Sequence, residues 1–67
     1  MAHPLKTYRA AHDKTLADLA AEVGSAAATI SRIENGKWIP SPELAIRLET
    51  ATKGVVNRRE LRPDLWG

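Results

Sequence analysis

The chain has 67 residues, with ten Lys and Arg against eight Asp and Glu, so its formal net charge is +2 and its pI is near 9.4. It contains no cysteine, which excludes a disulfide framework, a thiolate metal site and a cysteine nucleophile. There is no secretory signal, and no apolar run approaches the ~20 residues that span a bilayer, so we expect a soluble, cytoplasmic protein. A chain this short holds one small core, so we expect a single domain over residues 1–67 that gains stability from a dimer partner.

The first helix is predicted to open at His3-Pro4, because proline is favoured at the first helical position. Leu5 and Tyr8 are three residues apart and should face the core. Asp13-Lys14 then links this helix to the next one.

The second helix carries Leu16, Leu19 and Val23 at helical spacing, which predicts one apolar stripe. Thr15 stands just before it, where a hydroxyl can cap the free amides. Gly24 follows the stripe, where a chain leaving a helix often needs a positive φ.

A third helix is predicted from Ala26, with Ser25 as its cap and Asn35-Gly36 at its end. Ile30 and Ile33 lie three apart on its inner face. The expected core of the two-helix unit is Leu19, Ala20, Val23, Ile30 and Ile33.

Trp38-Ile39-Pro40 is predicted to be a loop, followed by a fourth helix capped by Ser41 and opened by Pro42. Asn57 and Glu60 have the spacing of a capping box for a short fifth helix that Pro63 breaks. The buried side chains expected here are Leu44, Ala45, Leu48, Ala51 and Leu61.

The outer face of the third helix is slim and carries no long acidic side chain before Glu34. A helix of this kind can enter a DNA major groove, which is wide enough to admit it. The face consists of Ala27, Ala28, Ser31 and Arg32, with Asn35 and Lys37 just beyond the helix end.

Residues Leu16 to Gly36 resemble the helix-turn-helix of the phage repressor and Cro family, also called the xenobiotic response element (XRE) family. Ala20, Gly24, Ile30 and Ile33 match its small-residue, turn and core positions, and 29–37 reads Thr-Ile-Ser-Arg-Ile-Glu-Asn-Gly-Lys. Residues 52–66 resemble a small Cro-like and antitoxin-like subset with Thr-x-Gly-x-Val and Leu-Arg-Pro-Asp. The resemblance implies an all-α, five-helix, lambda-repressor-like domain that regulates transcription in bacteria or phage as a Cro-like repressor.

The resemblance also implies site residues. A dimer would read an inverted-repeat, double-stranded DNA operator. Two large apolar residues end this small chain, Leu65 and Trp66, and they are either a lid on the monomer's core or half of a dimer contact. We expect residues after Gly54, including these two, to form or brace the dimer interface. The residues expected to contact base edges are Ala27, Ala28, Ser31 and Arg32. The residues expected to contact phosphates are Thr15, Ser25, Asn35 and Lys37. Thr29 could make either kind of contact.

In family members an arginine at the place of Arg9 pairs with the glutamate before Asn-Gly, here Glu34. Two positions depart from the family. Lys14 replaces an apolar residue, and Leu16 replaces a frequent phosphate-binding glutamine whose role Lys14 or Thr15 could take over.

Other functions find little support in the sequence. His3 and His12 form no metal motif, and no cofactor, enzyme or small-molecule effector is expected. An antitoxin with the same DNA-binding fold, and a helical protein-interaction module without DNA binding, remain as alternatives. For Trp38, packing over the junction of the third and fourth helices is favoured over contact with the DNA backbone.

Overall fold

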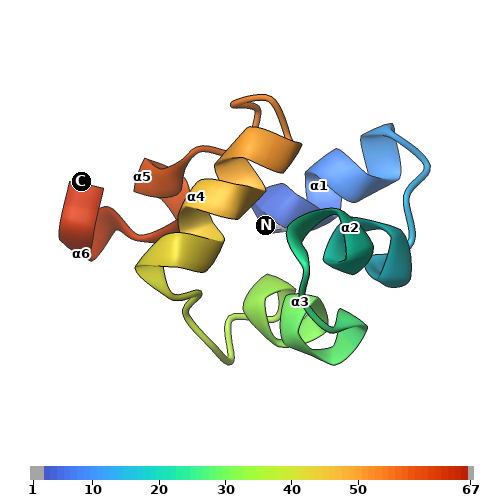
Figure 1. Ribbon diagram of the computed structural model, residues 1–67, viewed down its shortest axis with the longest axis horizontal. Helices are drawn as coiled ribbons and strands as arrows, with labels where there is room; N and C mark the ends of the chain where they lie inside the picture. Colours follow the sequence, from blue (N-terminus) through green and yellow to red (C-terminus); the bar gives the residue numbers. More distant parts are fainter. Residues whose placement is uncertain (1–2, 67) are drawn as a thin grey trace.

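The computed structural model describes residues 3–66, and this part of the chain forms six α-helices and no strand (Figure 1). The helices are α1 (Pro4–Ala11), α2 (Leu16–Val23), α3 (Ala27–Glu34), α4 (Pro42–Ala51), α5 (Arg58–Leu61) and α6 (Pro63–Trp66). The all-α prediction is confirmed. The helix count is six rather than five. The fifth helix ends at Leu61, before Pro63 as predicted, but Pro63 also occupies the first position of a further helix, α6, where its missing N–H costs no hydrogen bond.

Three of the six helices in residues 3–66 are capped by the predicted side chains. The Thr15 hydroxyl accepts from the Asp18 amide at 3.0 Å, Ser41 Oγ accepts from the Leu44 amide at 3.2 Å, and Asn57 Oδ1 accepts from the Glu60 amide at 3.0 Å. At α1 the cap is the imidazole of His3, whose Nδ1 lies 3.1 Å from the Leu5 amide. These bonds satisfy amides that the first helical turn leaves free.

The start of α3 differs from the prediction. Its N-cap is Ala26, which has no side-chain acceptor, and the helix begins at Ala27. The Ser25 amide instead donates to the carbonyl of Ala20 at 2.8 Å, which closes the turn after Gly24. Ser25 therefore belongs to the end of α2 rather than to the start of α3, and its predicted capping role is wrong.

Two helices end on residues with unusual backbone geometry. Asp13 follows α1 with a φ of 56° and Lys53 follows α4 with a φ of 55°, both in the left-handed region where side chains other than glycine are disfavoured. In each case the next residue donates its amide to a carbonyl five positions back, Lys14 to Arg9 and Gly54 to Glu49, both at 2.9 Å. These bonds satisfy carbonyls at the helix ends and hold the strained turns.

The core contains all five residues predicted for the α2–α3 unit, together with Leu5, Tyr8, Leu44, Ala45, Leu48, Val56 and Leu61. Ala51 is only partly buried, and it packs against this cluster. Val56 and Thr52 are buried without having been predicted. The Thr52 hydroxyl lies 2.8 Å from the Leu48 carbonyl and accepts from the Val56 amide at 3.1 Å, so it fixes the turn between α4 and α5.

Candidate nucleic-acid interface

The α2–α3 unit has the arrangement of a helix-turn-helix. The two helices pack against each other through the shared core, and Gly24, with a φ of 67°, makes the tight turn between them. In Figure 1, α3 lies along the lower edge of the molecule, with α2 above it. One side of α3 is therefore left open.

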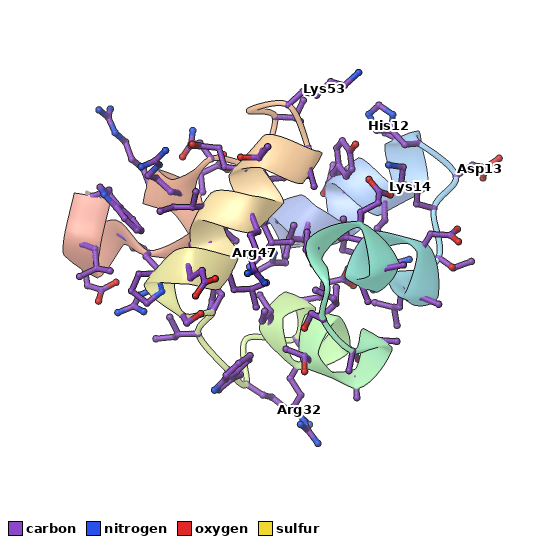
Figure 2. The ribbon with its side chains drawn as sticks, viewed as in Figure 1. His12, Asp13, Lys14, Arg32, Arg47 and Lys53 are labelled. Carbon is purple, nitrogen blue, oxygen red and sulfur yellow. The ribbon has the colours of Figure 1, made fainter. Side chains whose placement is uncertain are left out.

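The open side of α3 carries small side chains and one long cation. Ala28 and Arg32 are exposed, whereas Ala27, Thr29 and Ser31 are half-buried. Arg32 takes part in none of the ion pairs or side-chain hydrogen bonds found within residues 3–66, and Figure 2 shows its guanidinium pointing away from the body of the molecule. A free guanidinium beside methyl groups leaves both room and donors for a ligand in front of α3.

The acidic residue of α3 is withdrawn from this face. Glu34 accepts two hydrogen bonds from the Arg9 guanidinium, at 2.7 Å from Nε and 2.9 Å from the second terminal nitrogen. The side chains are only 5% exposed for Glu34 and 17% for Arg9, and the bound carboxylate raises the pKa of Arg9. The predicted pair is confirmed; it ties α1 to α3 and neutralises a charge that would repel phosphate.

The end of α3 presents polar groups to solvent. The Asn35 side-chain amide donates to the Ser31 carbonyl at 2.8 Å, which holds it against the last helical turn. The same nitrogen also lies 3.4 Å from the Ser31 hydroxyl oxygen, so both of these hydrogen bonds join Asn35 to Ser31. Gly36, with a φ of 70°, then turns the chain so that Lys37 is exposed. Asn35 itself, at φ −89°, is not left-handed.

The start of α2 is more constrained than the sequence suggested. Asp18 accepts the Thr15 backbone amide at 3.0 Å, so only the Thr15 hydroxyl proton remains to be donated. Those bonds hold the pKa of Asp18 below its usual value, and the carboxylate stays charged beside Thr15.

Lys14, one of the two candidates for the role of the missing glutamine, is paired with an acidic side chain of the protein itself. The Lys14 ammonium lies 2.7 Å from Glu22 and 5.5 Å from the centre of the Tyr8 ring, and the bond to Glu22 raises its pKa. Leu16 packs against the core. Of the predicted phosphate ligands, Ser25 is half-buried, and Thr15, Asn35 and Lys37 are exposed.

The loop after α3 exposes two large apolar residues. Trp38 is 47% exposed and Ile39 is 63% exposed, so the favoured prediction that Trp38 packs over the helix junction is not supported. The next residue, Pro40, is buried, and its carbonyl accepts a hydrogen bond from the Arg62 guanidinium at 3.0 Å. Sequence reasoning missed Ile39 and Arg62, because no local pattern signals a contact across 22 residues.

Metal and membrane sites are not found in the part of the chain that the structure describes. Residues 3–66 contain no group of three metal-ligating side chains and no helix long and apolar enough to cross a bilayer. His3 caps α1, and the His12 ring lies 4.3 Å from the Tyr8 ring.

Comparison with known proteins identifies this arrangement. The sequence model of the Helix-turn-helix family matches residues 5–55, which is most of the chain. The chain belongs to the XRE-type helix-turn-helix family. It is also 46% identical, over 48 residues, to an uncharacterized HTH-type transcriptional regulator of Methanocaldococcus jannaschii; the alignment covers 72% of this chain and 73% of the relative. No solved structure matches the chain.

Membership of the XRE-type family confirms the resemblance, the lambda-repressor-like helical fold and the absence of enzymatic activity, since the family consists of DNA-binding, non-enzymatic proteins. The matched residues 5–55 include nearly all of α1, the whole of α2, α3 and α4, and every predicted DNA contact from Thr15 to Lys37. Helices α5 and α6 of this XRE-type protein lie beyond the match.

Proposed function

We propose that residues 1–67 act as one sequence-specific DNA-binding domain, a Cro-like repressor that binds an inverted-repeat operator in the cytoplasm as a homodimer. The observation that carries the proposal is the open side of α3. Arg32 stands there exposed and free of any ion pair within residues 3–66, beside Ala28, while Glu34 is neutralised by Arg9.

In the proposed complex, the N-terminal half of α3 leads into the major groove while α2 crosses the backbone. Arg32 donates its two-pronged guanidinium to the O6 and N7 acceptors of a guanine. The methyl groups of Ala27 and Ala28 meet thymine methyls, and the Ser31 hydroxyl reaches a base edge. Thr29 contacts either a base or the backbone.

Phosphate contacts would set the register of the protein on the duplex rather than its sequence preference. The hydroxyl proton of Thr15 and the exposed ammonium of Lys37 are donors with no partner among residues 3–66. The exposed Asn35 amide would exchange its weaker contact with the Ser31 hydroxyl, at 3.4 Å, for a phosphate oxygen. Ser25, which does not cap α3, keeps its hydroxyl for the same use.

The proposed dimer follows from the geometry of DNA. Two recognition helices that read adjacent turns lie about 34 Å apart, so each α3 must lie about 17 Å from the two-fold axis. The longest extent of the protein is 28 Å, and Figure 1 shows α6 at one end of that axis and α3 in the other half. A two-fold contact at the α6 end therefore suits the required spacing better than one at the α1–α2 end.

Within this contact, the two terminal apolar residues have different roles. Leu65 is 49% exposed and is available to a partner. Trp66 packs against the core, with its ring 5.4 Å from the Arg58 guanidinium, which in turn is bound to Glu49. We therefore assign Leu65 to the dimer surface and Trp66 to bracing α6 from behind.

Selection of bound sequences from a random pool of duplex DNA tests the function, with the mass of the complex measured on the selected site. We expect an inverted repeat with half-sites one helical turn apart, bound by two copies of the chain. A pool without enrichment would refute the proposal and would instead favour a protein-interaction module that has kept the fold. Enrichment of a single half-site, saturated by one copy, would refute only the dimer.

A further inference from the structure

The loop after the recognition helix exposes two consecutive large apolar side chains. Trp38 is 47% exposed and Ile39 is 63% exposed. The other exposed large apolar residues found within residues 3–66 are Ile46, Val55 and Leu65, which stand apart from one another in the chain. Scattered single apolar residues are normal on a protein surface, whereas adjacent ones mark a site of interaction.

The pair formed by Trp38 and Ile39 is held beside the end of α3. The Lys37 amide donates to the Arg32 carbonyl at 2.9 Å, which closes the last turn of the helix. Trp38 is the next residue, so its Cα lies about 3.8 Å from that of a residue bonded to the helix. Pro40, two residues later, is buried. The exposed pair therefore stands between two points that the fold holds in place.

The loop lies on the side of the molecule that α3 presents to solvent. In Figure 1 the connection between α3 and α4 reaches the same lower edge as α3. Figure 2 shows the Arg32 guanidinium extending beyond that edge. A duplex whose major groove receives α3 would bring the backbone that borders the groove close to this connection.

The charges around the pair favour an anionic partner. Residues 35–42 contain no acidic side chain, and Lys37, immediately before the pair, is exposed. The nearest carboxylates along the chain, Glu34 and Glu43, are both paired with arginines. An apolar surface beside an unneutralised cation suits a partner in which apolar groups alternate with negative charges, as sugars and phosphates do in DNA.

We propose that Trp38 and Ile39 pack against the sugar-phosphate backbone beside the major groove that receives α3. The inference deepens the proposed function and rests on it. The indole offers an apolar face to a deoxyribose and one N–H to a phosphate oxygen, and Ile39 adds apolar contact with a neighbouring sugar. Because every nucleotide carries the same sugar and phosphate, this contact adds affinity without adding sequence preference.

Binding of Trp38→Ala to the preferred and a scrambled duplex, at several salt concentrations, tests the proposal. We expect the variant to bind both duplexes about tenfold more weakly, the effect of losing one aromatic contact and one hydrogen bond. The slope of log K against log salt concentration should stay unchanged, because no charge is removed. Trp38→Phe keeps an apolar ring but has no N–H, so it should lose less affinity than Trp38→Ala.

Ile39 and Val55 provide a matched comparison for the apolar contact. Both are β-branched and almost equally exposed, at 63% and 62%, but Val55 belongs to the loop between α4 and α5, at the top of Figure 1. We expect Ile39→Ala to weaken binding to both duplexes about two- to fivefold and Val55→Ala to leave it unchanged. A thermal melt of each variant checks that it folds, and exposed positions should change the midpoint little.

Fluorescence locates the indole directly, because the chain has only two tryptophans. In Trp66→Phe, Trp38 is the single emitter, and we expect the operator to protect it from quenching by acrylamide. Should Trp66→Phe fail to fold, the wild-type chain carrying 5-fluorotryptophan replaces it in ¹⁹F NMR, with Trp38→Phe assigning the two signals.

Three results would overturn the proposal. The first is Trp38 equally accessible with and without operator, or Trp38→Ala binding like the wild type. The second is a loss confined to the preferred duplex, because the ring would then contact a base edge. The third is protection of Trp38 that grows with protein concentration in the absence of DNA, which would assign the pair to a contact between copies of the chain. Failure of the wild-type chain to bind any DNA would instead refute the proposed function.

Discussion

Replacing Glu34 with alanine tests how much the ion pair between Arg9 and Glu34 contributes to the stability of the fold. In Glu34→Ala the Arg9 guanidinium loses both bonds to the carboxylate and keeps only its bond to the Lys14 carbonyl at 3.0 Å. Breaking a buried ion pair from one side costs about 3–5 kcal/mol because the remaining charge is left uncompensated. Since the Arg9 side chain stays 17% exposed and keeps one partner, we expect the lower end, about 3 kcal/mol.

That loss is large for a chain of this size. Domains are stable by roughly 0.05–0.15 kcal/mol per residue, which gives about 3–10 kcal/mol here. Each kcal/mol moves the melting midpoint of a small domain by roughly 4–8 °C, so Glu34→Ala should lower the midpoint by about 12–24 °C. Operator affinity, measured in the cold where the variant is folded, should change much less, because neither Arg9 nor Glu34 lies on the open side of α3.

A thermal melt followed by circular dichroism decides the matter. Glu22→Ala is the control: it breaks the more exposed pair with Lys14 and should move the midpoint far less. The variant lacking both Arg9 and Glu34 should be more stable than the sum of the two single losses predicts, because no charge is left unpaired. An unchanged midpoint in Glu34→Ala would refute the reasoning.

Four further outcomes are expected. Arg32→Ala should lose about 1–3 kcal/mol of binding free energy on the preferred site and relax the sequence preference at one base pair per half-site. Lys37→Ala should weaken binding to all sequences alike and reduce the slope of log K against log salt concentration by about one unit. Equal losses on preferred and scrambled DNA would make Arg32 another phosphate ligand. Leu65→Asp should shift sedimentation on the operator from dimer toward monomer, and an intact dimer would remove Leu65 from the interface. Lys53→Gly should raise the stability by about 0.5–1 kcal/mol by relieving its positive φ, and a lower melting midpoint would contradict this. Burial lowers the pKa of His3, so as the pH drops the imidazole is protonated in the unfolded chain before it is protonated in the folded one. Stability should therefore fall as the pH drops below about 6.5, the ordinary pKa of histidine. His3→Asn keeps an acceptor for the Leu5 amide and should remove the contribution of His3 to this fall, which is measured by following the melting midpoint against pH.

The sequence by itself determined the features that depend on neighbours within one helical turn. Leu19, Val23, Ile30 and Ile33 are buried as their spacing predicts, because a period of 3.6 residues fixes which side chains share a face. Thr15, Ser41 and Asn57 cap their helices for the same local reason, since each accepts the amide of the residue three positions further along the chain. The same period determines the outer face of α3, because the residues outside its buried stripe must lie on the opposite side of the helix.

Local patterns failed where two signals compete. Ser25 is a good cap, but the Gly24 turn takes its amide for α2, and the start of α3 is left to Ala26. Pro63 has two roles: it follows the end of α5, as predicted, and it opens α6 at the first helical position, which was not predicted.

The tertiary structure decided what lies opposite each side chain. Lys14, a candidate phosphate ligand by sequence, is bound to Glu22 on α2, and Trp38, expected to pack over a helix junction, is half exposed. The bond from Arg62 to Pro40 exists only because α5 and α6 fold back toward the start of α4. Such contacts join residues far apart in the chain, and their free energy depends on distance and burial in the folded state, which spacing along the sequence does not encode.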